Sequence, residues 1–77
     1  MNDPASSETQ SIRITLNGAS RDVAPGTTIR ALVELMGLAG VPCAAEVNRK
    51  LVPRREHETR QIVPGDVIEL VSLVGGG

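Results

Sequence analysis

An alternating segment near the start of the chain most constrains what this protein can fold into. Apolar residues occupy every second position of Ser11–Asn17, as Ile12, Ile14 and Leu16. Such alternation, with β-branched residues among the apolar ones, is typical of a strand that is buried on one face. The Asn-Gly pair that follows favours the two positive φ angles of a type I′ turn. The segment therefore predicts a β-hairpin whose second strand is Ala19–Val23.

A short helix is predicted after the hairpin. Thr27 and Thr28 follow the break at Ala24-Pro25-Gly26, and either hydroxyl can cap the first turn of a helix. Gly37 sits where a helix ends in a left-handed residue, and Leu38 can close a hydrophobic contact across that end. The expected length is about three turns. The apolar residues at helical spacing are Ile29, Leu32, Val33 and Met36.

A second pair of strands is predicted in the middle of the chain. Cys43–Asn48 alternates as a strand, with Arg49-Lys50 as the turn that follows it. Leu51-Val52 then begins a short partner strand, which Pro53 stops because proline cannot donate to a sheet ladder. The polar segment Arg54–Gln61 predicts an exposed loop with one helical turn.

The last strand is predicted at Val67–Val71, after a tight turn at Pro64-Gly65-Asp66. It is apolar almost throughout, so we expect it to be central and covered on at least one face. A hairpin, a crossing helix and a final strand beside the first one make a small α+β roll. Because the chain has no Phe, Tyr or Trp, its core must be aliphatic.

Three segments are expected along the 77 residues. Residues 1–10 are polar and predict a disordered extension, and residues 11–72 form the single domain. Residues 73–77 are expected to be a flexible C-terminal tail. Glycines have no Cβ atom, so such a tail can thread a narrow cleft and carry a carboxylate into another protein's active site.

Charge and composition exclude several classes of function. The formal net charge is −1, which gives no reason to expect nucleic acid or an anionic membrane as a partner. No apolar run is long enough to span a bilayer, and no signal peptide is recognisable. A single cysteine fits a reducing cytosol, so a cytoplasmic location is expected. No phosphate-binding loop, metal-ligand cluster or nucleophile–base set is present, which argues against an enzyme.

The chain resembles the ThiS family, the sulfur carrier proteins of thiamin thiazole biosynthesis, which have a ubiquitin-like β-grasp fold. Four pieces carry the resemblance: Thr15–Gly18, Val47–Arg54, Gly65–Val71 and the terminal Gly75-Gly76-Gly77. The resemblance implies a mixed sheet of four to five strands packed on one helix. Two departures are a longer N-terminal extension and the lack of a tryptophan after Pro53-Arg54, where the family often has one.

The resemblance also implies a chemistry for the glycine end. The Gly77 carboxylate, presented by Gly76, would be adenylated and then converted to a thiocarboxylate that supplies sulfur to the thiazole ring. An E1-like adenylyltransferase of the ThiF type would use the ATP, so no cofactor is expected on this chain. A thiazole synthase of the ThiG type would take the sulfur, and a donor such as a cysteine desulfurase would supply it. The protein would be a carrier and not an enzyme.

Two groups of residues are candidates for binding these partners. Leu73, Val74 and Gly75 precede the terminal glycines, and exposed apolar groups there suggest docking to a partner. The polar loop supplies a second group, whose members either grip an acidic partner surface or are ordinary exposed side chains. These are Arg54, Arg55 and Arg60.

Three other residues have reactive side chains but ordinary interpretations. Cys43 lies on an apolar strand and is interpreted as a small core residue rather than a persulfide carrier. His57 lies among charged residues without a partner, so a solvated loop histidine is expected. Asp66 is expected to serve its turn.

Three alternative functions stay open on the sequence. The small subunit of molybdopterin synthase also ends in two glycines, but it tends to contain phenylalanines and a Pro-Pro approach that this chain lacks. A ubiquitin-like modifier is a second alternative, with Lys50 as the one lysine available for chain building. An interaction module with an inert glycine end is the third.

Overall fold

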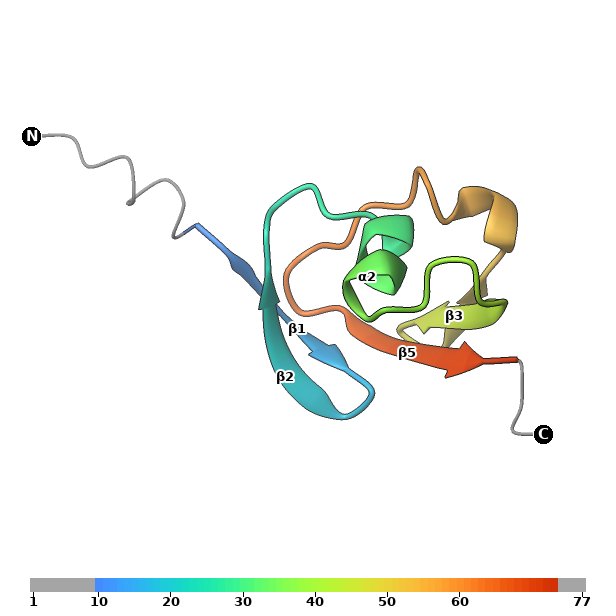
Figure 1. Ribbon diagram of the computed structural model, residues 1–77. Coiled ribbons are helices and arrows are strands. Elements are labelled where there is room, and N and C mark those ends of the chain that lie inside the picture. Colours follow the sequence, from blue (N-terminus) through green and yellow to red (C-terminus); the bar gives the residue numbers. More distant parts are fainter. Residues whose placement is uncertain (1–9, 74–77) are drawn as a thin grey trace, which may run out of the picture.

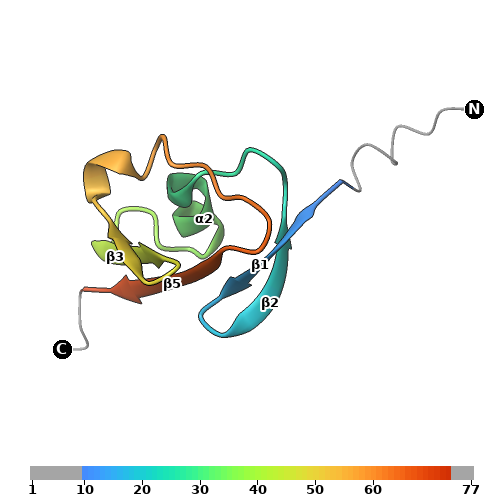
Figure 2. The ribbon, with the colours of Figure 1, turned by 180° about the vertical axis from the view of Figure 1, so that it is seen from behind.

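The computed structural model describes residues 10–73, which form one five-stranded sheet with an α-helix packed across it (Figures 1 and 2). The strands lie in the order β2-β1-β5-β3-β4, so the sheet is mixed and the predicted α+β class is confirmed. The elements are β1 (Ile12–Leu16), β2 (Ala19–Val23), α2 (Ile29–Leu35), β3 (Cys43–Val47), β4 (Lys50–Val52), the 3₁₀ turn η1 (Arg54–Glu56) and β5 (Val67–Ser72).

The first hairpin forms as its sequence predicts. β1 and β2 pair antiparallel over their full length, from Ile12 opposite Val23 to Leu16 opposite Ala19. The turn residues Asn17 and Gly18 have φ angles of 50° and 85°. Both are positive, as a type I′ turn requires. Local sequence signals are therefore sufficient for this part of the fold.

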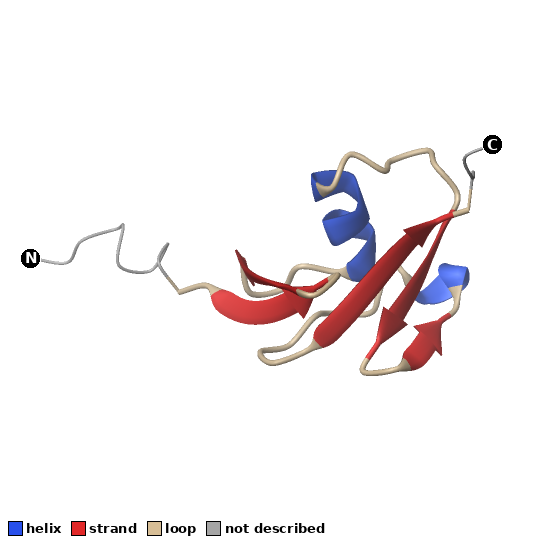
Figure 3. Cartoon of the chain, turned by 90° about the horizontal axis from the view of Figure 1, so that it is seen from below, coloured by secondary structure: helices blue, strands red, loops and turns tan. Residues whose placement is uncertain are grey.

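β5 is the central strand of the sheet. It runs parallel to β1, with Thr15 opposite Val67, and antiparallel to β3, with Cys43 opposite Ser72. Ile68 and Leu70 are buried under the helix, whereas the alternate residues of β5 are exposed. The sheet therefore has one face covered by α2 and one open face, as the view from below indicates (Figure 3). The prediction of a central final strand beside the first is confirmed.

The helix starts and ends at the predicted signals but is shorter than expected. Thr28 is the N-cap, and its side chain accepts a hydrogen bond from the Ala31 N–H at 3.1 Å. The other candidate, Thr27, instead donates its hydroxyl hydrogen to the Ala24 carbonyl at 2.7 Å. The helix has 7 residues, about two turns instead of the expected three. Met36, predicted on the buried face, is the C-cap and is 37% exposed.

The end of the helix is a Schellman motif. Gly37 has a φ angle of 76°, and its N–H donates to the Glu34 carbonyl at 3.0 Å. The Leu38 N–H donates to the Val33 carbonyl, also at 3.0 Å. These two bonds satisfy carbonyls that would otherwise lack partners, and Leu38 packs against the core. The predicted left-handed end and its hydrophobic contact are confirmed.

The core between α2 and the sheet is aliphatic throughout. The four large side chains most completely excluded from solvent are Ile14, Ile29, Leu32 and Ile68. Burial of each stabilises the fold by about 1.5–3 kcal/mol. A helix of two turns is marginal alone, so its stability comes from this packing. The buried apolar residues are Ile14, Leu16, Val23, Ile29, Leu32, Val33, Ala45, Val47, Val52, Ile62, Ile68 and Leu70.

The polar loop after β4 docks on the first turn of α2. The Ile29 N–H donates to the Arg60 carbonyl at 3.0 Å, and the Arg30 N–H donates to the His57 carbonyl at 2.8 Å. First-turn N–H groups have no partner within a helix, so the loop satisfies two of them. The predicted helical turn in this loop is present as η1.

The second turn lies one residue earlier than predicted. Its central residues are Asn48 and Arg49, with φ angles of 53° and 71°, and Lys50 already belongs to β4. The apolar alternation of the preceding strand was extended through Asn48, which placed the predicted turn at Arg49-Lys50. The Asn-Arg turn nonetheless places both flanking strands in register, with Val47 opposite Lys50.

Candidate functional site

The candidate site is built around the end of β5, because this strand leads to the glycines. Beyond Ser72, the Leu73 N–H still donates to the Pro42 carbonyl at 2.8 Å. The backbone is therefore anchored as far as the end of the described segment. The remaining tail residues of the predicted site lie outside the described residues: Val74, Gly75, Gly76 and Gly77.

Two turn asparagines fasten β5 from both sides. Asn17 accepts a hydrogen bond from the Leu70 N–H at 2.8 Å, and its amide nitrogen lies 3.4 Å from the Leu70 carbonyl. Asn48 accepts from the Val67 N–H at 2.9 Å. Both residues have a positive φ, which asparagine tolerates better than most side chains. The strand is thus held at its start and its middle by side chains of neighbouring turns.

Asp66 extends this arrangement. It is only 4% exposed, and its carboxylate accepts from the Asn48 side-chain amide at 3.0 Å and from the Val63 N–H at 2.9 Å. A buried carboxylate is costly unless it is hydrogen-bonded, and these donors offset that cost. The predicted role of Asp66 in its turn is confirmed. It also joins the turn before β5 to the turn between β3 and β4.

An apolar row of exposed side chains on the open face consists of Val71 and Leu73 beside the exit of β5, Leu51 of β4 and Val67 at the start of β5. Val67, Val71 and Leu51 are 45%, 54% and 66% exposed, and Leu73 is 62% exposed. Glu69 lies between Val67 and Val71 along β5, whereas Leu51 and Leu73 line the same hollow. Grouped exposed apolar side chains mark interaction surfaces more often than isolated ones do. The predicted exposure of Leu73 is confirmed.

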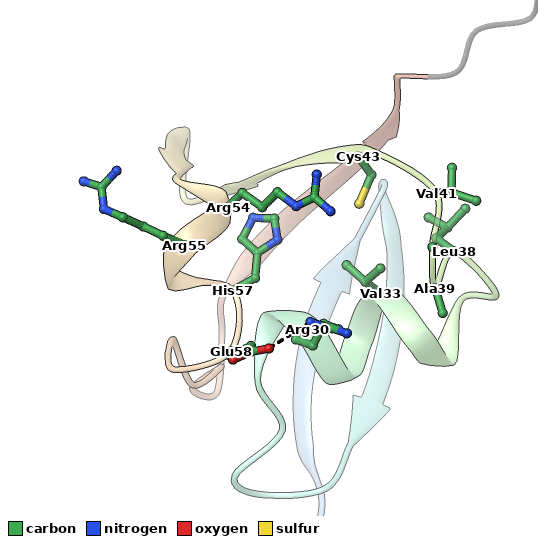
Figure 4. Close-up of a pocket in the computed structure, with 11 residues that line it drawn as sticks. Arg30, Val33, Leu38, Ala39, Val41, Cys43, Arg54, Arg55, His57 and Glu58 are labelled. Atoms are coloured by element: carbon green, nitrogen blue, oxygen red, sulfur yellow. Dashed lines mark hydrogen bonds and ion pairs between the residues drawn. The ribbon is translucent and has the colours of Figure 1, made fainter.

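A cleft of about 420 Å³ lies on the other face of the sheet, between α2, the loop that follows it and the polar loop. Figure 4 shows its two walls. Arg30, Arg54 and His57 lie on one side, while Val33 and Cys43 lie on the other. The apolar wall is completed by Leu38 and Val41, and the polar one by Arg55 and Glu58. The cleft is therefore basic on one wall and apolar on the other.

The predicted arginine group divides in the structure. Arg54 and Arg55 are exposed residues that line the cleft, whereas Arg60 is exposed but is not part of its lining. Arg30, which sequence reasoning missed, joins them from the helix. It pairs with Glu34 at 3.1 Å and with Glu58 at 2.9 Å. The first of these pairs follows from an i, i+4 spacing, but the second joins residues 28 positions apart.

His57 is not the solvated residue that its neighbours in sequence predict. It is 7% exposed, and its Nε2 lies 3.1 Å from the Val52 carbonyl oxygen. Since a carbonyl can only accept, Nε2 carries the hydrogen and donates. The polar loop has one ring-bearing side chain, and it is the one buried residue of Arg54–Gln61. The imidazole ring was the one feature in the sequence that distinguished His57 from its charged neighbours.

Cys43 matches its core interpretation in part. It packs against the core but is half-buried, and its sulfur faces the cleft (Figure 4). Within residues 10–73 no group of three His, Cys, Asp or Glu residues could hold a metal ion. The same residues include no helix long and apolar enough to cross a membrane.

Comparison with known proteins identifies the family. The sequence model of the ThiS family matches residues 14–77. The chain belongs to the ThiS family. This membership confirms the predicted resemblance to the family. Among solved structures, a ThiS thiamine biosynthesis protein from Geobacter metallireducens superposes with a TM-score of 0.72. It is 23% identical and covers 86% of this chain and 100% of its own, which confirms the β-grasp fold of the ThiS chain.

Two curated relatives of this ThiS chain are thiazole synthases. The protein from Paramagnetospirillum magneticum is 29% identical over 66 residues, and that from Magnetococcus marinus is 33% identical over 66 residues. In both cases the match covers 86% of this chain and 20% of the relative. The ThiS chain thus spans about a fifth of the length of the curated relatives it matches.

Proposed function

We propose that the Gly77 carboxyl group of this sulfur carrier is adenylated and then converted to a thiocarboxylate, which delivers sulfur for the thiazole ring of thiamin. The observation that carries this proposal is the central strand of a ThiS-family chain, hydrogen-bonded up to Leu73 and followed in sequence by Val74-Gly75-Gly76-Gly77. A firmly held strand gives a partner a fixed point from which the glycines start.

The chemistry follows from the poor reactivity of a carboxylate. Its oxygen is a poor leaving group, so ATP first converts Gly77 to an acyl-adenylate with release of pyrophosphate. The terminal sulfur of a partner's persulfide then attacks the carbonyl carbon, and AMP leaves with the former carboxylate oxygen. A second thiol cleaves the sulfur–sulfur bond, which leaves the thiocarboxylate on Gly77 and a disulfide on the partner. The carrier supplies only the carboxyl group.

The activating partner in this proposal is an E1-like adenylyltransferase of the ThiF type, which binds the ATP. We assign the apolar row of the open face, with Val74 and Gly75 in the tail, to docking on it. When a partner covers exposed valine and leucine side chains, the complex is stabilised because apolar surface is removed from water. This assignment is supported by the 54% exposure of Val71 and the 62% exposure of Leu73 beside the strand exit.

The acceptor in this proposal is a thiazole synthase of the ThiG type. The curated relatives support it, because in them a segment similar to this chain makes up a fifth of a protein named thiazole synthase. A segment that is covalently part of such an enzyme in some organisms is expected to bind it in others. A cysteine desulfurase is the proposed sulfur donor, and the one cysteine of the chain fits a cytoplasmic setting for all these steps.

Removal of Gly76-Gly77 tests the proposal. We expect this truncated protein to fail to restore growth of a carrier-deficient strain without added thiazole, while its far-ultraviolet circular dichroism and unfolding curve stay unchanged. The matched control is removal of residues 1–9, which should leave both growth and folding intact. Thiazole formation by the truncated carrier would contradict the proposed role of Gly77.

A further inference from the structure

The cleft between α2 and the polar loop is lined by charged side chains on one wall and by apolar side chains on the other. Its polar wall includes Arg30, Arg54 and Arg55 with one acidic residue, Glu58. Within residues 10–73, Arg30 takes part in two ion pairs, whereas no ion pair is formed by Arg54 or Arg55. The cleft is thus locally basic on a chain whose formal net charge is −1.

The two arginines stand on a loop that is held in place. Pro53 precedes them with a φ angle of −58°, and the His57 ring anchors the loop by donating to the Val52 carbonyl. The Arg30 N–H also donates to the His57 carbonyl, which ties the loop to the helix. A surface that is already ordered loses little conformational freedom on binding. The polar wall is therefore suited to recognising a partner.

The opposite wall is apolar and lies next to the exit of β5. It is formed by Val33, Leu38 and Cys43, among others. Cys43 pairs with Ser72 in the sheet, so the cleft begins one strand away from the end of β5. A smaller hollow shares Cys43, Arg54 and His57 with the cleft and also includes Leu73 at the strand exit. An occupant of the cleft would lie beside the start of the glycine tail.

We propose that this cleft docks an acidic segment of the thiazole synthase, with a carboxylate on Arg54 and Arg55 and a neighbouring apolar side chain against the half-buried Leu38 and Cys43. The inference rests on the proposed function for the identity of the partner. Charge complementarity selects an acidic segment, because Arg54 and Arg55 line the cleft and form no ion pair within residues 10–73. In Figure 4, Arg54 reaches toward Cys43 while Arg55 extends outward, so the two can contact an extended segment rather than one small anion.

A protein segment suits this cleft better than a small free anion. Arg54 and Arg55 are exposed, and exposed ion pairs with a single small ion are weak and screened by salt. A folded partner can cover the arginines and bury the apolar wall in the same step. The binding should consequently weaken as salt is raised, while retaining an apolar component that salt does not screen.

The test measures binding of the full chain to the thiazole synthase of the same organism by isothermal titration calorimetry. The variants are Arg54→Glu, Arg55→Glu and the double change, and the matched control is Arg60→Glu. The control makes the same charge reversal on the same loop but outside the cleft. We expect the double variant to bind at least about tenfold more weakly, with a smaller salt dependence, and Arg60→Glu to bind within about twofold of the natural chain.

These binding results test the cleft inference separately from the proposed formation of the thiocarboxylate. Equal binding by all variants would overturn the cleft inference and leave thiocarboxylate formation untouched. Equal weakening by Arg60→Glu would also overturn it, because net charge rather than the cleft would then be responsible. If the natural chain forms the thiocarboxylate but does not bind thiazole synthase, the assigned occupant is wrong. Circular dichroism of every variant shows whether a loss of binding comes from unfolding.

Discussion

The turns at Asn17-Gly18 and Asn48-Arg49 both hydrogen-bond to β5 through an asparagine side chain. The second turn also hydrogen-bonds to a buried carboxylate, whereas the first does not. The side chain of Asn17 bonds to Leu70 of the strand, at both its N–H and its carbonyl. Asn48 bonds to Val67 and also donates to the buried carboxylate of Asp66. The first turn has glycine at its second position, whereas the second has arginine at a φ angle of 71°. The first turn is thus locally favourable, while tertiary bonds maintain the second.

Asn48→Ala should have the largest effect. It removes the bond to the Val67 N–H, leaves the Asp66 carboxylate short of a donor, and places alanine at a positive φ. We expect a loss of about 2–4 kcal/mol in the free energy of unfolding. Urea unfolding followed by far-ultraviolet circular dichroism measures it, since the chain has no Trp or Tyr for fluorescence. Asn48→Gly, which keeps the φ angle unstrained, should recover about 1 kcal/mol of this loss.

Asn17→Ala should cost less, about 1–2.5 kcal/mol. The 2.8 Å bond from the neutral Leu70 N–H and the 3.4 Å bond to the Leu70 carbonyl are lost, but no buried carboxylate is left without a donor. The same unfolding experiment measures the change. Amide hydrogen exchange should in addition show faster exchange at Leu70 in this variant and at Val67 in Asn48→Ala. If Asn17→Ala proved more destabilising than Asn48→Ala, the ranking of the two turns would be reversed.

Arg49→Gly should stabilise the protein by about 0.5–1 kcal/mol, because glycine adopts a φ angle of 71° without strain. The reciprocal change, Gly18→Ala at a φ angle of 85°, should destabilise it by about 1 kcal/mol. No atom lies within 4 Å of the added Cβ at Gly18, so only backbone strain contributes there. Thermal unfolding of both variants checks the pair. A destabilised Arg49→Gly protein would show that the arginine side chain contributes a contact of its own.

Asp22→Asn should have the smallest effect. The hydrogen bond from Arg13 lowers the pKa of Asp22, and the pair lies on the exposed surface of the first hairpin. Because the folded-state pKa is below the unfolded one, the carboxylate stabilises the fold at neutral pH. That contribution is lost as pH falls through the lowered pKa. The variant should be slightly less stable at neutral pH and equal to the natural chain in strong acid, as urea midpoints at both pH values would show.

These two turns also show how much the sequence could predict. The hairpin of β1 and β2 was predicted with its register because alternation and an Asn-Gly pair are local signals. The second turn was placed one residue late because its positive φ angles depend on bonds from Asn48 to β5 and Asp66. Such bonds join parts of the chain that are distant in sequence.

The candidate site was predicted to a similar degree. Leu73 and the three predicted loop arginines are exposed, but only two of the arginines line the cleft. His57 and Arg30 were missed, since the burial of a single loop residue and an ion pair across 28 positions leave no periodic pattern. The helix was predicted too long because Met36 continues the apolar spacing of the helix. In the structure the helix ends at Leu35, and Met36 is its C-cap. The glycines of the site lie outside the described residues.

The most direct test of this account is the intact mass of the carrier after incubation with ATP, a sulfur source and the adenylyltransferase of its own organism. We predict a gain equal to the exchange of one oxygen for one sulfur, located in the peptide that contains Gly77. An adenylate without sulfur would show activation but not the thiocarboxylate step. No change of mass, with an adenylyltransferase shown to act on another carrier, would contradict the claim that Gly77 carries the sulfur.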